Sequence, residues 1–206
     1  MIFDFDGVLA ESLAPMLRNA QQVCQELGYP RVPTQKDLEA LEKMEFSEFG
    51  VQLGIRQDDI DAFVTRNLEL FNSGRESLAI VPGMENVIKK LSQSATLAII
   101  TGNSSIVVNK FLRENALLDR FEKILSVEDE GNRVEKILSI KEQYKRSNED
   151  FYFVGDAISD VKSAHLAGIK SVAVGWGHQS MGRLIKGEPD FTVDTPGDLL
   201  YLFAQK

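Results

Sequence analysis

Near the N-terminus stands Phe3-Asp4-Phe5-Asp6-Gly7-Val8-Leu9, an apolar segment that carries two carboxylates and a glycine. In an extended strand alternate side chains share a side, so Asp4 and Asp6 can face one small volume while the phenylalanines pack elsewhere. Two buried carboxylates repel each other and lose hydration, so a positive group must offset them. Mg²⁺ suits this role because it prefers carboxylate oxygens. The alternative is a strand that ends in an acidic turn, since Asp and Gly are common turn residues.

The composition is that of a folded globular protein, with 43% hydrophobic residues in a chain of 206. This length suits one large domain or a domain with an insertion. The net charge of -8 argues against a nucleic-acid partner, because such binding relies on Lys and Arg. No apolar stretch approaches the roughly 20 residues that cross a bilayer, and no signal peptide is recognisable. We therefore expect a cytoplasmic protein without a membrane partner.

Metal ligands other than carboxylates are scarce in this sequence. Cys24 is the only cysteine, which excludes an intrachain disulfide and a thiolate-rich metal site. Apolar residues surround it at helical spacing, so we expect a small buried side chain. His165 and His178 fall in different predicted elements. A histidine-based metal cluster is therefore not expected, and neither histidine is given a role.

From Thr96 onward, apolar runs alternate with helical patterns. Strands are predicted at residues 97–101, 123–126, 151–155 and 171–175, the last being the final predicted strand. Helices are predicted through residues 107–112, 134–144, 158–166 and 196–203. Apolar runs without polar alternation are typical of strands covered on both faces. Together with the N-terminal strand they predict a parallel sheet with helices on each side.

Between Ser12 and about Ile80 the pattern changes to helical segments with no convincing strand. These segments are predicted at residues 16–27, 38–41, 46–53 and 60–71. Val81-Pro82-Gly83 marks the return to the sheet. We predict a core domain of residues 1–12 and 81–206 and a mobile helical cap domain of residues 13–80. The alternative is that the helical region completes a single core.

Polar residues follow three predicted strands at the points where the strands end. They are Asp4 and Asp6, then Thr101-Gly102-Asn103, then Gly155-Asp156-Ala157-Ile158-Ser159-Asp160. In an open parallel sheet, ligands bind outside the carboxyl ends of the strands. Carboxylates and hydroxyls that converge on this edge indicate a functional site.

In their order and spacing, these motifs resemble the haloacid dehalogenase-like superfamily, and within it the phosphoglycolate phosphatase-like members with a helical cap. The resemblance rests on residues 4–9, 99–103 and 154–160, and more loosely on 167–169 and 174–177. It implies an α/β fold with a Rossmann-like parallel sheet, helices on both faces and an inserted all-helical cap domain. It also implies a phosphatase that acts on a small phosphorylated metabolite, similar to phosphoglycolate.

The resemblance assigns the chemistry to the acidic residues. Asp4 attacks phosphorus and becomes an aspartyl phosphate, which water then hydrolyses. Asp6 acts as general acid to the leaving group and then as general base for the water. Mg²⁺ is held by the Asp4 carboxylate, the backbone carbonyl of Asp6 and the Asp156 carboxylate. Asp160 positions a metal-bound water or a nearby cation.

The same resemblance assigns phosphate binding to the Thr101 hydroxyl and to the amide of Gly102 or Asn103. A strand-to-helix turn offers free N–H groups and a helix dipole that suit an anion. The alternative for Thr101 is a routine helix cap, at Thr101 itself or at Ser104.

A cation, normally lysine, neutralises the phosphorylated aspartate in this superfamily, and here the chain departs from the pattern. Arg133 occupies the lysine position, and Lys136 lies one helical turn further on. Residues three apart share a helix face, so either side chain can serve. The alternative is that both are solvated helix charges.

Two other functions stay open on the sequence alone. A sugar phosphomutase of the β-phosphoglucomutase type uses the same motifs. The second is a catalytically silent phosphate-binding or regulatory module, which would explain why the usual lysine is missing from its position. A true dehalogenase is disfavoured because that branch lacks the second aspartate, and Asp6 is present. The oligomeric state and the substrate are also open; possible cap contacts to a substrate are Arg18, Asn19, Lys43 and Arg56.

Overall fold

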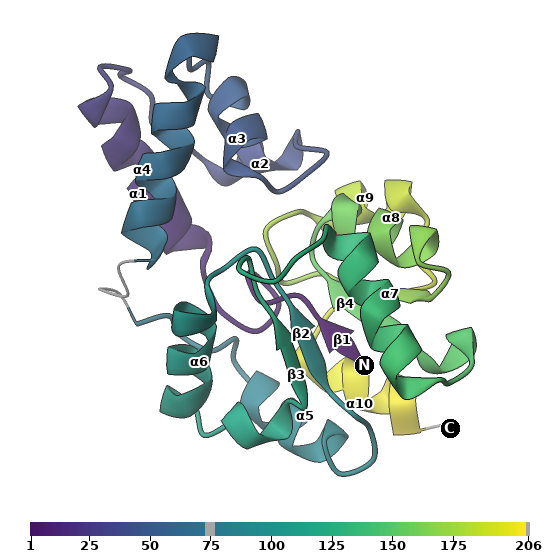
Figure 1. The fold of residues 1–206 in the computed structure, drawn as a ribbon. Coiled ribbons are helices and arrows are strands. Elements are labelled where there is room, and N and C mark those ends of the chain that lie inside the picture. Colours follow the sequence, from purple (N-terminus) through teal and green to yellow (C-terminus); the bar gives the residue numbers. More distant parts are fainter. Residues whose placement is uncertain (73–76, 205–206) are drawn as a thin grey trace.

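Six strands form the sheet in the computed structural model, which describes residues 1–72 and 77–204. They are β1 (Ile2–Phe3), β2 (Ala98–Ile100), β3 (Lys123–Leu125), β4 (Tyr152–Gly155), β5 (Lys170–Val174) and β6 (Phe191–Val193). Their order is β3-β2-β1-β4-β5-β6, and every neighbouring pair is parallel. Figure 1 labels the strands β1 to β4 of this sheet. The parallel sheet predicted from the apolar runs is confirmed.

Helices cover both faces of this sheet. They are α5 (Met84–Leu91), α6 (Ser105–Glu114), α7 (Arg133–Tyr144), α8 (Ile158–Leu166), α9 (Met181–Leu184) and α10 (Pro196–Ala204), with short 3₁₀ turns η2 (Leu118–Arg120), η3 (Asn148–Asp150) and η4 (Ile185–Gly187). Alternate residues of a strand point to opposite faces of the sheet, so the hydrophobic core has one layer on each face. Phe3 and Val154 pack with α5, α6 and α10, whereas Ile2 and Phe153 pack with α7 and α8. The predicted fold class is confirmed.

Two elements of this part differ from the sequence prediction. The prediction that residues 171–175 form the last strand was wrong, because β6 adds a strand beside β5. It comprises only three residues between Asp190 and Asp194, too few for a periodic pattern. Helix α5 was also not predicted, although its buried residues do follow helical spacing. They are Met84, Val87, Ile88 and Leu91.

The inserted region forms a helical bundle beside the sheet (Figure 1). Its elements are α1 (Leu13–Glu26), α2 (Gln35–Glu39), α3 (Phe46–Gln52), η1 (Gln57–Asp59) and α4 (Ile60–Asn72). The bundle buries a hydrophobic cluster of its own, in which the Phe49 and Phe63 rings meet edge to face and Cys24 is buried as predicted. Residues 73–76 of the predicted cap and 205–206 of the predicted core lie outside the described residues.

Two connections join the bundle to the sheet, and they run side by side. Glu11 N donates to Ala79 O, and Val81 N donates to Leu9 O, both at 2.9 Å. An antiparallel bridge lies between these two bonds. The chain therefore enters and leaves the bundle at one place.

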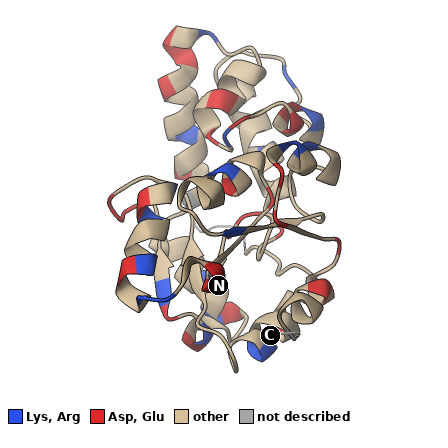
Figure 2. Ribbon diagram, turned by 90° about the vertical axis from the view of Figure 1, so that its right-hand side faces the viewer, with Lys and Arg blue, Asp and Glu red and all other residues tan. Residues whose placement is uncertain are grey.

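Charged residues of both signs are spread over the helices of the bundle and of the sheet layers (Figure 2). Most of the ion pairs join partly exposed side chains, such as Lys89 with Glu85 and Arg66 with Glu26. Such pairs contribute little to stability individually. Within residues 1–72 and 77–204, none of the helices combines the length and the apolar character that a membrane span needs.

Candidate active site

The candidate site lies at the carboxyl ends of the strands, at the point where the strand order of the sheet reverses. The chain places β2 and β3 on one side of β1, and then β4, β5 and β6 on the other. Open α/β sheets bind ligands in the crevice at such a point. Asp4, Asp6 and Asp156 line one cavity there together with Asn103 and Arg133. The structure therefore brings together residues that the sequence placed after three separate strands.

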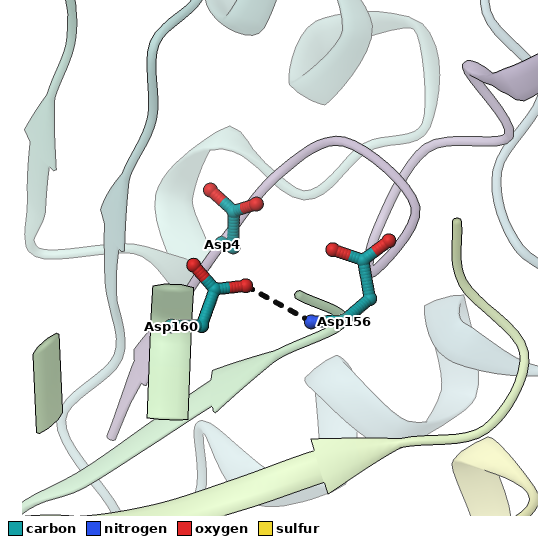
Figure 3. A group of neighbouring side chains, drawn as sticks. All are labelled: Asp4, Asp156 and Asp160. Carbon is teal, nitrogen blue, oxygen red and sulfur yellow. Dashed lines mark hydrogen bonds between the residues drawn. The ribbon is translucent and has the colours of Figure 1, made fainter. Parts of the chain in front are cut away.

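Asp4, Asp156 and Asp160 form a buried group of carboxylates (Figure 3). One oxygen of each lies within 4.8 Å of the others. The three residues are exposed by only 7%, 1% and 1%. Asp160 Oδ2 also accepts hydrogen bonds from the N–H groups of Asp156, at 3.1 Å, and Ala157, at 3.0 Å, and so fixes the start of α8. Three convergent carboxylates at this spacing are the donor set that a hard cation such as Mg²⁺ prefers.

Burial governs the electrostatics of this group. It raises the pKa of Asp4 to about 6, although the Arg133 guanidinium opposes the rise. It also raises the pKa of Asp156 to about 6, against the backbone hydrogen bond from His178. Both shifts mean that the protein alone does not balance the negative charge. A divalent cation would supply the missing charge, so the residues present fit Mg²⁺.

One prediction concerns Asp156→Asn in the metal-free protein. The folded-state pKa of about 6 exceeds the ordinary aspartate pKa of 3.8, so the folded protein holds this proton more tightly than the unfolded chain. The carboxylate therefore destabilises the fold increasingly as pH rises through this window. We expect the variant to be more stable than wild type by on the order of 2 kcal/mol at about pH 7.5, and by much less at about pH 4.5.

Urea unfolding with a chelator present measures this difference. The matched control is Asp119→Asn, since Asp119 is exposed. It should show no comparable growth of the stability difference with pH. A variant less stable than wild type at neutral pH would contradict an uncompensated charge at Asp156.

Arg133 reaches the carboxylates, whereas Lys136 contacts a different element. Arg133 is the first residue of α7; its Nη2 lies 3.4 Å from Asp4 Oδ1, and its Nη1 pairs with Asp160. The buried Lys136 Nζ instead donates to the carbonyl oxygen of Ser126, at 2.6 Å, just after β3. Of the two cations that the sequence left open, the structure places Arg133 against Asp4. Neither side chain is a fully solvated helix charge.

The turn after β2 holds the residues predicted to bind phosphate. Gly102 and Asn103 line the cavity, whereas Thr101 is buried and its Oγ1 accepts the Asn103 N–H at 3.0 Å. The helix cap of α6 is Ser104, whose Oγ accepts an N–H at 3.4 Å. The Asn103 side chain donates to Asp6 Oδ2 at 2.5 Å. Asn103 therefore orients Asp6, a contact that the sequence did not predict.

Asp6 lies at the cavity with one carboxylate oxygen hydrogen-bonded and its pKa raised. Asn103 occupies its Oδ2, while its buried Oδ1 has no hydrogen-bond partner of good geometry among the described residues. Burial and the neighbouring Asp4 raise the pKa of Asp6 to about 6, and the nearby Ser12 hydroxyl only partly opposes this rise. A carboxyl group that titrates close to neutrality can act both as acid and as base.

His178, which the sequence analysis left without a role, is part of this site. The residue is 3% exposed, and its backbone N–H donates to Asp156 Oδ2 at 2.6 Å. Its ring lies between Asp156 and the start of α1, with Nδ1 3.3 Å from Asp156 Oδ2 and Nε2 3.2 Å from Ser12 Oγ. Burial lowers the pKa of His178, which favours the neutral ring. The contact joins residues far apart in the chain, so no local pattern could indicate it.

Two glycines make room for the Asp156 carboxylate. Gly7 has φ +72°, and a Cβ there would overlap Asp156 Oδ2. A Cβ at Gly177 would overlap the Asp156 side chain from the loop after β5. The glycine of the first motif is therefore required by both its backbone conformation and its close approach to Asp156.

The loop after β5 also binds the helical bundle. Gln179 is buried, and its Nε2 donates to the carbonyl oxygens of Leu38 and Leu41, both at 3.0 Å. Its Oε1 accepts the N–H of Ile158, the first residue of α8, at 2.8 Å. One side-chain amide therefore links the helix that follows Asp156 to the bundle. No role could be predicted for Gln179, because this contact also depends on the tertiary fold.

A cavity of about 340 Å³ lies between the polar floor of the sheet and the bundle. The floor contributes Asp4, Asp6, Gly102, Asn103, Arg133, Asp156 and His178. The bundle contributes Met16, Leu38, Leu41, Met44, Glu45, Phe46, Ser47, Phe49, Val64, Leu68 and Phe71. The volume is that of a site for a small molecule.

The chain is similar to several known proteins. Residues 1–174 match the model of a family described as haloacid dehalogenase-like hydrolase. The chain is 26% identical over 212 residues to a phosphoglycolate phosphatase of Synechococcus elongatus, covering 100% of this chain and 97% of that protein. It is 27% identical over 216 residues to a phosphoglycolate phosphatase of Vibrio parahaemolyticus, covering 98% and 94%. A solved haloacid dehalogenase-like hydrolase from Streptococcus pneumoniae shares the fold, with a TM-score of 0.86 at 21% identity over 98% and 96% of the two chains.

Proposed function

Because the chain belongs to the haloacid dehalogenase-like hydrolase family and is a phosphatase within it, we propose that it hydrolyses a small phosphorylated metabolite with Mg²⁺. The observation that carries this proposal is the buried group of Asp4, Asp156 and Asp160 beside Asp6 and Arg133. The names of the phosphoglycolate phosphatase relatives support a phosphate monoester as substrate. The cytoplasmic location expected from the sequence stays a prediction.

We propose that the Asp4 and Asp156 carboxylates and the Asp6 carbonyl hold Mg²⁺, with Asp160 beside them. When bound, the ion would supply positive charge that offsets the carboxylates and the phosphoryl oxygens. Asp160 has a second task, because it also fixes the start of α8 through two backbone N–H groups.

Asp4 is the proposed nucleophile. Its carboxylate oxygen forms a bond to phosphorus while the bond from phosphorus to the leaving oxygen breaks, which gives an aspartyl phosphate and an alcohol. Asp6 donates the proton to the leaving oxygen and then takes a proton from water. That water attacks the aspartyl phosphate, which releases inorganic phosphate and regenerates Asp4. The hydrogen bond from Asn103 to Asp6 Oδ2 leaves Oδ1 for the proton.

We assign the phosphate-neutralising cation to Arg133, because it lies against Asp4 while Lys136 donates to Ser126. The Thr101 hydroxyl and the Gly102 amide are the proposed donors to the phosphate oxygens. The Asn103 amide is less suited to this role, since it already donates to Thr101 Oγ1.

We propose that residues 13–80 act as a cap domain over a core of residues 1–12 and 81–206. The hydrophobic cluster of the bundle and the adjacent connections support this division. The cavity between the two parts would admit substrate when the cap moves away, and closure would exclude water.

Release of inorganic phosphate from an aryl phosphate tests the proposed function. We expect hydrolysis with Mg²⁺, loss of activity with a chelator, and recovery when Mg²⁺ is restored, because the buried carboxylates need the positive charge. Mg²⁺ should also raise the unfolding temperature of wild type more than that of Asp156→Asn. Metal binding without turnover of any phosphate ester would favour the silent binding module. Isomerisation of a sugar phosphate without phosphate release would favour the phosphomutase.

A further inference from the structure

Resting on the proposed function, we infer that the preferred substrate is a phosphate monoester of an uncharged, apolar alcohol or phenol. A leaving group that carries a carboxylate, as in phosphoglycolate, fits the cavity poorly. The inference rests on one cavity in which a polar floor from the sheet faces a mainly apolar wall from the bundle.

The bundle side of the cavity is built mainly from apolar side chains. Met16, Met44, Phe46, Phe49, Leu68 and Phe71 all line it. Phenylalanine rings offer flat contact surfaces to an aryl or alkyl group, and methionines adapt to irregular shapes. The phosphate is held at the floor, so the leaving group must point at this wall.

The same wall offers no positive charge to a carboxylate. Among the described lining residues from the bundle there is no Lys or Arg, and the charged one is Glu45. A carboxylated leaving group would lose hydration against the apolar wall and would face a like charge. Arg133 on the floor cannot compensate, because it pairs with Asp4 and Asp160 at the phosphate position.

Basic residues of the bundle lie elsewhere. Arg56 binds Tyr29 and Asp59 on the outer surface, with Nε 2.9 Å from the Tyr29 hydroxyl. The sequence offered several side chains as possible contacts to a substrate, and none of them lines the cavity. They are Arg18, Asn19, Lys43 and Arg56.

The cavity size limits the leaving group. Its volume of about 340 Å³ must hold the phosphate as well as the alcohol. This lies at the lower end of the usual range for small-molecule sites. The cavity therefore suits a single ring or a short chain.

The substrate test compares three phosphate esters on wild-type enzyme with Mg²⁺: phenyl phosphate, phosphoglycolate and phosphocholine. We expect kcat/KM for phenyl phosphate to exceed the other two by about tenfold or more. A preference for the anionic or the cationic ester would overturn the inference and leave the phosphatase assignment intact.

Binding of non-hydrolysable analogues separates the two proposals. Calorimetry should show tighter binding of phenylphosphonate than of phosphonoacetate. This order of affinities can be measured even if the enzyme hydrolyses no ester. The absence of hydrolysis would count against the proposed function, whereas the order of affinities tests the inference. Tighter binding of phosphonoacetate would overturn the inference.

A charge placed in the wall provides the second test. Met44→Lys introduces a side chain of similar length into the lining, and we expect it to shift the ratio of kcat/KM toward phosphoglycolate by about tenfold. Val51→Lys is the matched control, because Val51 is 60% exposed on α3 and does not line the cavity. A folded Met44→Lys variant with an unchanged ratio would show that the leaving group does not reach this wall.

Discussion

Asp4→Asn is expected to abolish phosphate release, lowering kcat by at least about 10⁴-fold. An amide has no carboxylate oxygen to attack phosphorus, while Asp6, Arg133 and the other site residues stay in place. The variant should remain folded. Its metal-free form should even be more stable than wild type near neutral pH, because burial raises the pKa of Asp4 to about 6 and the charge there costs stability.

Two measurements test this expectation together. Phosphate release gives the rate, and thermal unfolding shows whether the variant has kept its structure. Acid-quenched wild-type enzyme should carry one phosphoryl group per chain during turnover, detectable by mass, and the variant should carry none. Substantial residual hydrolysis by a folded Asp4→Asn protein would mean that another residue or water attacks phosphorus.

Replacing Arg133 with Met is expected to lower kcat/KM by roughly 10²–10³-fold, the usual cost of removing a preorganised charge from the reacting group. The guanidinium lies 3.4 Å from Asp4 Oδ1 and pairs with Asp160, so its loss removes the cation that lies against the proposed nucleophile. Arg133→Lys should recover part of the activity, because a compact ammonium restores the charge without the planar fork.

Lys136→Met is the matched control for that experiment. Lys136 lies one turn further along α7, and its Nζ donates to Ser126 at 2.6 Å. Its replacement should lower the free energy of unfolding, because a buried carbonyl loses its donor, with little change in kcat/KM. If Lys136→Met proved the more damaging to turnover, the cation role would pass from Arg133 to Lys136.

Residues that sit at strand ends were predictable from the sequence. Asp4, Thr101 and Asp156 each follow an apolar run, and the carboxyl ends of parallel strands meet at one sheet edge. The short strand β6 was not predictable, because three residues at a sheet edge carry no periodic signal. Helix α5 did carry such a signal and was nevertheless missed.

The remaining site residues depend on contacts across long sequence separations. His178 and Gln179 belong to a loop whose course is fixed by the strand before it and by the bundle opposite. Two of their partners, Ser12 and Leu38, lie more than a hundred residues earlier in the chain. Which of Arg133 and Lys136 lies against Asp4 also depends on the tertiary fold, since the spacing of residues on a helix predicts a shared face but not the direction of a long side chain.

The paired backbone bonds between Glu11 and Ala79 and between Leu9 and Val81 have an evolutionary consequence. Because both ends of the inserted segment meet at one point, a different insert with equally close ends can replace it without shifting any strand. Related enzymes can then diversify by exchanging the inserted segment. The residues at the sheet edge are inherited unchanged, while each new insert changes the selectivity for the alcohol that is released.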